Sequence, residues 1–361
     1  MALYDSELYM KDVLKVANMN LPWEKLRDKS VAISGATGMI GSFLVDVLFS
    51  KNETNGLGCR VIVLGRDEEK ARRRFLRHEK KKEFSFASFI AEDKLSGKEL
   101  PSMNYVMHLA SNTHPKQYAV DPIGTITTNV IGTKNLLDIA VLKDCERFLF
   151  ASSNEVYGEN RGDVEEFDED YCGYINSNTL RAGYPESKRC GEALCQAYKK
   201  QYGLDVVIAR LTRTYGPTMN MSDTKVISQF IKNGMRGEDI VLKSAGTQQY
   251  SFQYVADSVS GILTVLLSGI SGEAYNISDN TGNISLKDLA NVIAQLCEKK
   301  VVFDLPDKVE AEGFSVVTKA LLCGDKIRGL GWLPLYRINE GVERTIAILK
   351  EVYGRNEGCI R

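Results

Sequence analysis

The chain has 361 residues, of which 43% are hydrophobic and 26% charged, and its formal net charge is -1 at pH 7. This balance is typical of an ordinary globular protein and gives no electrostatic reason to expect a nucleic-acid or membrane partner. No apolar run is long enough to span a bilayer, and Met1–Lys29 lacks the apolar core of a signal peptide, so a cytoplasmic protein is expected.

Cysteine and histidine usage argues against a metal or disulfide framework. The eight cysteines lie at irregular spacing without a Cys-x-x-Cys pair, and the chain has only three histidines. We therefore expect reduced thiols and no metal site. His114 follows an expected strand and is interpreted as a loop histidine without a catalytic task.

Short β-branched runs alternate with amphipathic segments of helical length. Strands are expected at Val31–Ser34, Val61–Leu64, Tyr105–Leu109, Phe148–Ala151 and Val206–Leu211. Helices are expected at Ile40–Ser50, Ile126–Val141, Tyr184–Tyr202, Lys225–Gly234 and Val255–Leu267. This alternation predicts an α/β fold, with a Rossmann-type doubly wound parallel sheet and a smaller C-terminal α/β substrate lobe. The expected division is an extension at 1–29, an NAD(P)-binding domain at 30–212 and an interleaved substrate lobe at 213–361.

The first expected strand runs into a glycine-rich turn and then an apolar helix, which is the context of a dinucleotide fingerprint. Gly35 allows the tight turn, Gly38 lets the backbone approach a pyrophosphate, and Gly41 lets helix and strand pack closely. The helix N-terminus offers free N–H groups and a positive dipole end to the phosphates. The residues expected to bind the cofactor here are Gly35, Thr37, Gly38, Met39, Ile40 and Gly41.

The end of the second strand leaves the choice of cofactor open. Gly65 and Arg66 stand where an NAD-specific site usually places an acid that holds the ribose hydroxyls. Arg66 can bind the 2′-phosphate of NADP+ or stack on the adenine of either cofactor. Asp93 is a candidate hydrogen-bond partner for the adenine, although an exposed loop carboxylate explains it nearly as well.

A tyrosine and a lysine one helical turn apart form the candidate catalytic pair. Tyr184 and Lys188 lie on one face of an expected helix, and Ser153 follows a buried strand upstream. A cationic Lys188 would lower the pKa of the Tyr184 phenol, which then exchanges a hydroxyl proton while hydride moves to the cofactor. Ser153 would hydrogen-bond the same substrate oxygen.

These motifs, in this order, resemble the extended short-chain dehydrogenase/reductase family, which includes the NAD-dependent epimerases and dehydratases. The resemblance implies that Leu109, Ala110, Ser111 and Asn129 also contact the cofactor, together with Tyr184 and Lys188. Within the family the chain is most similar to UDP-glucuronate decarboxylases and nucleotide-sugar 4,6-dehydratases. The matching segments are Asn154–Gly158, Arg181–Tyr184, Thr214–Pro217 and Ser251–Val255. A nucleotide-sugar substrate, oxidised at its C4 hydroxyl and altered at the neighbouring carbon, is implied.

Glu155 is the candidate for the second chemical step. A 4-keto sugar acidifies its C5 hydrogen, and a carboxylate beside Ser153 can remove that hydrogen or orient a C5 carboxylate for loss. The alternative is that Glu155 has only a structural role, in which it caps a local segment or pairs with an arginine. Asn154 stands where some dehydratases carry a second acid, which weakens the case for dehydration.

Two positions depart from the family pattern. Arg213 replaces an asparagine and Tyr250 replaces an arginine. A guanidinium moved across the cleft can still neutralise a diphosphate, since either geometry offers bidentate N–H groups, or it can mark a different substrate. We expect Asn154, Arg213 and Tyr250 to bind the substrate.

Three other functions are compatible with the same motifs. A 4-epimerase would convert its substrate without losing water or carbon dioxide. A reductase of a non-nucleotide substrate would consume NAD(P)H, and a non-catalytic scaffold would only bind the dinucleotide. By analogy with the family, a homodimer is expected to form through the helices at Ile126–Val141 and Tyr184–Tyr202.

Overall fold

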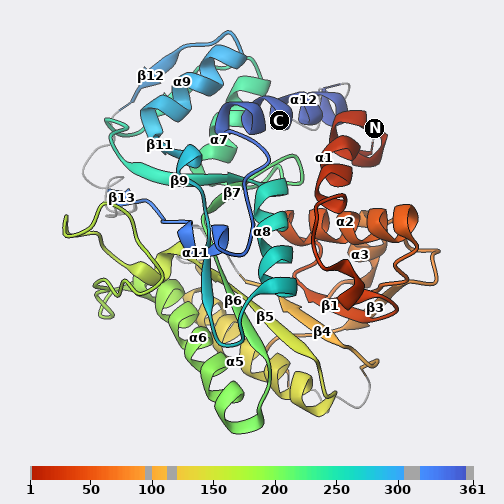
Figure 1. Cartoon of the computed structure of the whole chain (residues 1–361). Helices are drawn as coiled ribbons and strands as arrows, with labels where there is room; N and C mark the ends of the chain where they lie inside the picture. The colour runs from red at the N-terminus through yellow and green to blue at the C-terminus, as the bar shows by residue number, and fades with distance from the viewer. Residues whose placement is uncertain (1, 94–99, 112–119, 305–317, 355–361) are drawn as a thin grey trace.

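The computed structural model describes residues 2–93, 100–111, 120–304 and 318–354. Its centre is a parallel sheet of 7 strands in the order β10-β6-β5-β4-β1-β2-β3 (Figure 1). The strands are β1 (Ser30–Ser34), β2 (Arg60–Gly65), β3 (Phe84–Ser88), β4 (Tyr105–His108), β5 (Arg147–Ser153), β6 (Val206–Leu211) and β10 (Ala274–Ile277). The predicted doubly wound parallel sheet is thereby confirmed.

Alternate residues of each strand face two separate hydrophobic cores. In β1, Val31 and Ile33 belong to one core and Ala32 to the other. This alternation follows from the two-residue period of a strand. The first core is covered by α2 (Met39–Asn55), α3 (Glu68–Arg74) and α8 (Val255–Ser268). The second is covered by α5 (Pro122–Leu142) and α6 (Gly183–Tyr202), which lie side by side in Figure 1.

The order of strands reverses between β1 and β4. In open α/β sheets the crevice at the carboxyl ends of the strands beside such a reversal binds ligands. The sequence pattern did not single out β3, an edge strand with mixed burial, or β10, which has only four residues. Because β10 and α8 come from the segment 213–361, that segment contributes to the main sheet as well as to the smaller lobe.

The smaller lobe is built around β9 (Gln249–Tyr254), and Figure 1 shows it above the main sheet. Strands β7 (Arg213–Tyr215), β11 (Asn283–Ser285) and β13 (Lys319–Ala320) all pair with β9. A separate parallel pair joins β8 (Ile240–Leu242) to β12 (Val301–Phe303). The lobe's helices are α7 (Val226–Met235), α9 (Leu286–Leu296) and α12 (Ile338–Tyr353), whereas the short α11 (Asp325–Arg328) contacts β10 and α8.

The amino-terminal segment is anchored to both parts of the molecule. Its helix α1 (Glu7–Ala17) contacts α2, α8 and α12. Asp12 of α1 is fully buried and accepts hydrogen bonds from the hydroxyls of Tyr254 (2.7 Å) and Tyr336 (2.6 Å). Arg344 of α12 donates to the same carboxylate at 2.7 Å. Since its hydroxyl is bound by Asp12, Tyr254 is a packing residue.

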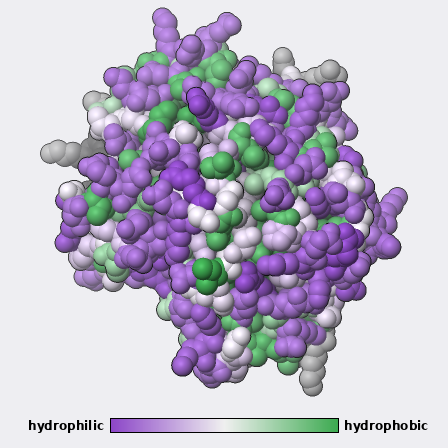
Figure 2. Space-filling model, viewed as in Figure 1, coloured by the Kyte–Doolittle hydropathy of each residue, from purple (hydrophilic) through white to green (hydrophobic). Residues whose placement is uncertain are grey.

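The remaining helical turns are short 3-10 segments: η1 (Leu3–Asp5), η2 (Trp23–Leu26), η3 (Asn154–Tyr157), η4 (Leu180–Ala182) and η5 (Asn280–Gly282). Within the described residues, no helix combines the length and the apolar character needed to cross a membrane. The face of the molecule seen in Figure 2 is largely hydrophilic, with hydrophobic residues scattered among the polar ones.

Candidate active site

The glycine-rich turn joins β1 to α2 beside the end of β4. Gly35 adopts a left-handed conformation with φ of 74°. A Cβ at this position would lie 2.7 Å from the backbone nitrogen of Ala110, so only glycine fits. A Cβ at Gly41 would lie 2.4 Å from the carbonyl oxygen of Gly35. These two glycines therefore let the turn, the helix and the end of β4 pack closely together.

The first turn of α2 is open to a ligand. Gly38 is the exposed N-cap residue, and no side chain caps the helix. Thr37, Met39 and Ile40 are partly exposed around it. Free backbone N–H groups at an uncapped N-terminus, next to a glycine that allows close approach, fit the pyrophosphate of a dinucleotide.

Two candidates for the adenosine end of the site lie on the surface. Arg66 directly follows β2 and is exposed. Asp93 is also exposed, and its backbone carbonyl accepts a hydrogen bond from Asn135 of α5 at 3.1 Å. Both follow the carboxyl ends of strands on the same side of β1. His114 lies outside the described residues.

The end of β4 is linked to α6 by a chain of hydrogen bonds. Ser111 donates to Asn129 of α5 at 2.7 Å, and Asn129 donates to Ser187 of α6 at 2.9 Å. Leu109 and Ala110, which precede Ser111, are partly exposed. Asn129 therefore acts as a buried bridge that holds the loop after β4 against the start of α6.

Tyr184 lies at the start of α6, where the end of β5 meets this chain. Its hydroxyl is hydrogen-bonded to Ser153 and to Ser111. Burial raises the pKa of the phenol, as does the nearby Glu155 carboxylate, while both serine contacts and Arg181 lower it. The structure therefore brings the predicted pair Ser153 and Tyr184 together and adds Ser111, which the sequence suggested only as a cofactor contact.

Lys188 lies one turn further along α6 and is buried. Its Nζ donates to the carbonyl oxygen of Ala151 in β5 at 2.8 Å. Burial lowers the pKa of Lys188 to about 8, although the carboxylate of Glu192 opposes the change. His108 of β4 is also buried, and both burial and the charge of Lys188 lower its pKa to about 3. His108 is therefore neutral, and it bridges Ser34 (2.7 Å) and Thr133 (3.0 Å) as a structural residue.

Glu155 is in η3, two residues after Ser153. Its backbone N–H donates to the Ser153 hydroxyl at 3.2 Å. Its carboxylate forms an ion pair with Arg181, at 2.8 Å between Oε2 and Nη2. Sequence reasoning noted an arginine partner only as an alternative role and did not identify Arg181. Arg181 lies three positions before Tyr184, and the 3-10 turn η4 brings it to Glu155.

Arg213 and Tyr250 come together on neighbouring strands β7 and β9. The guanidinium carbon lies 3.6 Å from the centroid of the Tyr250 ring, a cation–π contact. The Nη1 atom of Arg213 is buried and has no hydrogen-bond partner among the described residues. Burial lowers the pKa of Arg213, while Tyr250 and Glu155 favour its charged form. Asn154, next to Glu155, is mostly buried.

Comparison with known proteins identifies the family of this chain. Residues 31–278 match the family described as NAD dependent epimerase/dehydratase family. The chain belongs to this family. The resemblance to the extended short-chain dehydrogenases, and with it the prediction of an NAD-dependent enzyme, is confirmed.

Individual relatives give finer likenesses. The chain is 34% identical over 316 residues to UDP-glucuronic acid decarboxylase 5 of Arabidopsis thaliana, and the match covers 86% of each chain. It is 36% identical over 251 residues to UDP-glucuronic acid decarboxylase 1 of Xenopus tropicalis, covering 68% of this chain and 56% of that relative. The latter match spans little more than half of the relative's length.

A solved structure extends the likeness to three dimensions. The dTDP-glucose 4,6-dehydratase from Streptomyces venezuelae, solved with NAD bound, is 26% identical and superimposes with a TM-score of 0.78. The match covers 92% of this chain and 100% of that one. The fold therefore agrees over both the main sheet and the smaller lobe.

Proposed function

We propose that this chain is an NAD-dependent enzyme that modifies a nucleotide-sugar by transient oxidation of the sugar's C4 hydroxyl, in the manner of a dehydratase or decarboxylase. The observation that carries the proposal is the cluster of Ser153, Glu155 and Tyr184 at the carboxyl edge of the sheet. Relatives named as UDP-glucuronic acid decarboxylases and a dTDP-glucose 4,6-dehydratase support a nucleotide-sugar as the substrate.

NAD+ in the crevice supplies the hydride acceptor. The glycine-rich turn fits its pyrophosphate, and the proposed contacts are Gly35, Thr37, Gly38, Met39, Ile40, Gly41, Leu109, Ala110, Ser111 and Asn129. Arg66 and Asp93 are proposed to bind the adenosine end of the cofactor. Both residues are exposed on the surface. Tyr184 and Lys188 are proposed to contact the nicotinamide end.

The proposed first step is proton removal by Tyr184. The phenolate takes the proton of the C4 hydroxyl while Ser153 hydrogen-bonds the same oxygen. Lys188, one turn away on the same helical face, contributes a positive charge that favours the phenolate. The hydrogen bond between the phenol and Ser153 supports this role, because a hydroxyl that donates to the phenolate stabilises its ionised form.

The proposed second step belongs to Glu155. Once C4 is a ketone, the hydrogen at C5 is acidic, and the Glu155 carboxylate can remove it or orient a C5 carboxylate for loss of carbon dioxide. Arg181 orients this carboxylate through the ion pair. Bound NAD+ would accept the hydride from C4 and return it to the sugar, so the reaction would consume no cofactor.

Arg213 and Tyr250, with Asn154, are proposed to bind the substrate. A buried guanidinium with an unsatisfied N–H is costly unless a ligand completes it. An anionic group of the nucleotide-sugar, either a phosphate or a sugar carboxylate, would satisfy Nη1. Tyr250 holds the guanidinium plane in place through the stacking contact.

A 4-epimerase is the second candidate. The ion pair between Glu155 and Arg181 favours it, because a paired carboxylate can be a structural group and epimerisation needs no acid at this position. Such an enzyme would still use Ser153, Tyr184 and Lys188, and its product would have the mass of its substrate.

We also propose that the chain forms a homodimer through α5 and α6. Several apolar side chains of α5 are exposed, including Ile123 (75%), Ile126 (41%) and Ile131 (40%). Burying such side chains between two copies would remove apolar surface from water.

The experiment that tests the function is a panel of UDP-, dTDP-, GDP- and CDP-sugars, including UDP-glucuronate, followed by product mass and cofactor absorbance. Loss of water or carbon dioxide supports the proposal, and an isomass product supports the epimerase. Glu155→Gln should abolish the loss while leaving C4 oxidation, seen as accumulated NADH. Net consumption of added NADH would contradict both candidates and indicate a reductase.

A further inference from the structure

Glu192 lies on the face of α6 that carries the catalytic pair. Tyr184, Lys188 and Glu192 follow at four-residue intervals, so they lie on one helical face. Lys188 binds the carbonyl of Ala151, and Glu192 accepts a hydrogen bond from the next residue, Ser152, at 2.5 Å. The two residues of β5 directly before Ser153 are thus both held by α6.

Arg210 of β6 fixes the Glu192 carboxylate from the other side. Its Nε lies 3.0 Å from Oε1 and its Nη2 lies 2.8 Å from Oε2, a bidentate pair. Arg210 and Ser152 are register partners in β6 and β5, so both side chains meet α6 on the same face of the sheet. The Nη1 of Arg210 also donates to the hydroxyl of Tyr157 (2.9 Å), in the η3 turn that carries Glu155.

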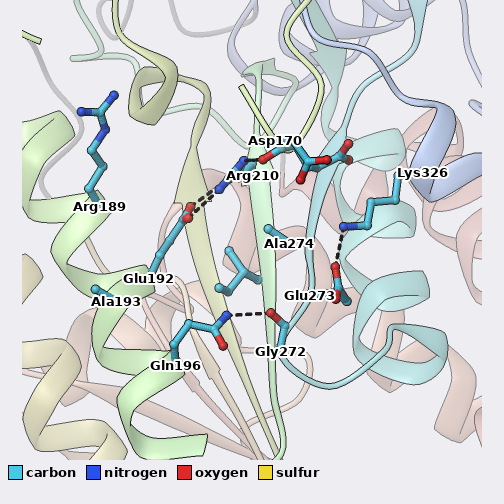
Figure 3. A pocket seen from close by; sticks show the side chains of 12 residues that line it. Asp170, Arg189, Glu192, Ala193, Gln196, Arg210, Gly272, Glu273, Ala274 and Lys326 are labelled. Carbon is cyan, nitrogen blue, oxygen red and sulfur yellow. Dashed lines mark hydrogen bonds and ion pairs between the residues drawn. The ribbon is translucent and has the colours of Figure 1, made fainter. Parts of the chain in front are cut away.

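The ion pair of Glu192 and Arg210 borders a hollow of about 380 Å³ between α6, β6 and β10. Figure 3 shows Glu192 reaching from α6 to Arg210 there, with a second pair, Lys326 and Glu273, on the opposite wall. The side chains of Glu192 and Arg210 are 14% and 13% exposed, so the pair is shielded but in contact with water.

Few charged groups face Lys188. On α6 they are Glu192 and Cys195, and burial raises the pKa of the Cys195 thiol, which stays neutral. From β4 comes the neutral His108, and from β5 the Phe150 ring, 4.9 Å from Nζ. Among the described groups that shift the Lys188 pKa upward, Glu192 is therefore the one that carries a negative charge.

We infer that Glu192 is a positioning residue for the proposed reaction: clamped by Arg210, it holds the end of β5 that carries Ser153 and places a carboxylate one helical turn from Lys188. The inference rests on the proposed function for its kinetic consequence. Its electrostatic part concerns Lys188 alone and can be measured without a substrate.

The test compares Glu192→Gln and Glu192→Asp with the wild-type protein. Glutamine keeps the size but removes the charge, so the pKa of Lys188 should fall by about one unit. The pKa is followed by the ¹³Cε NMR shift of the lysine signal that disappears in Lys188→Met. Aspartate keeps the charge but is too short to hold both Ser152 and Arg210. In Glu192→Asp the pKa of Lys188 should therefore stay the same, and kcat should fall without a change in KM.

Glu186→Gln is the matched control, because Glu186 is also on α6 and its salt bridge to Arg189 is long, at 3.8 Å. It should leave both the Lys188 pKa and kcat as in the wild type. An unchanged Lys188 pKa in Glu192→Gln would overturn the inference. If that variant does not fold because Arg210 is left unpaired, the double variant Glu192→Gln/Arg210→Gln replaces it, and the Lys188 pKa should still fall, but by less, because losing the Arg210 cation opposes the change. If no nucleotide-sugar is turned over, the proposed function fails, but the NMR titration still decides the electrostatic role.

Discussion

Arg213 stacks on Tyr250 with its guanidinium carbon 3.6 Å from the ring centroid, and these are the two positions that the sequence resemblance marks as departures from the expected pattern. The contact joins β7 to β9, whose register places Arg213 beside Phe252, two residues beyond Tyr250 on the same face of β9. The guanidinium is thus held against a ring, and the Glu155 carboxylate also favours its charged form. The buried Nη1 of Arg213 has no hydrogen-bond partner among the described residues.

Replacing this cation should weaken substrate binding. Arg213→Asn restores the family's usual residue and removes a charged hydrogen bond worth about 1.5–3 kcal/mol, so KM should rise about 10- to 150-fold. Tyr250→Phe, which keeps the ring under the guanidinium, should change KM little. Steady-state kinetics on the active nucleotide-sugar measures both. A KM unchanged in Arg213→Asn would show that the substrate's anion binds elsewhere.

The two glycines of the turn should respond differently to alanine. At Gly35 the methyl group meets the backbone of Ala110 and the left-handed conformation costs ~1–2 kcal/mol, so urea denaturation should show lower stability. At Gly38 the backbone is ordinary and a Cβ has its nearest contact at 3.2 Å. Gly38→Ala should therefore fold normally but bind NAD about tenfold more weakly, because its methyl group faces the pyrophosphate. Wild-type affinity in Gly38→Ala, measured by calorimetry, would contradict the proposed cofactor position.

Burial lowers the pKa of Lys188 to about 8. Activity should therefore fall as the pH rises through this value, because the neutral amine no longer favours the Tyr184 phenolate. Stability should respond in the opposite direction. The folded-state pKa lies below the value of ~10.4 in an unfolded chain, so between these values the unfolded chain binds more protons and this group makes the free energy of unfolding rise with pH. A pH–rate profile and urea denaturation across this range separate the two effects. Lys188→Met should remove this group's contribution to the stability change.

The proposed dimer predicts that a lysine substitution at one exposed apolar residue disrupts the dimer, whereas the same substitution at another leaves it intact. Ile131→Lys places a charge on the exposed surface of α5 and should give a monomer by size-exclusion chromatography with light scattering. Leu333→Lys, at a residue that is 63% exposed and outside α5 and α6, should remain dimeric. A monomeric wild-type protein, or dimers in both variants, would rule out this interface.

Much of the cofactor site can be predicted from the sequence because its determinants are local. A buried strand, a glycine turn and an apolar helix are consecutive in the chain, and the backbone requirement at Gly35 arises within that turn. The spacing of Tyr184 and Lys188 is likewise set by helical geometry. The residue types themselves indicate a proton-transfer pair beside a dinucleotide, without knowledge of any distant contact.

The remaining relationships depend on which distant segments become neighbours. Ser152 meets Arg210 through the register of β5 and β6, and Arg213 meets Tyr250 through the pairing of β7 with β9. Asp12, in an amino-terminal segment without an assigned role, is bound by Tyr254, 242 positions away. Sheet order and register result from the packing of the whole chain, so no short sequence pattern specifies these pairs. Local chemistry can therefore be inferred from the sequence, whereas the partners that hold each charged group are determined by the packed fold.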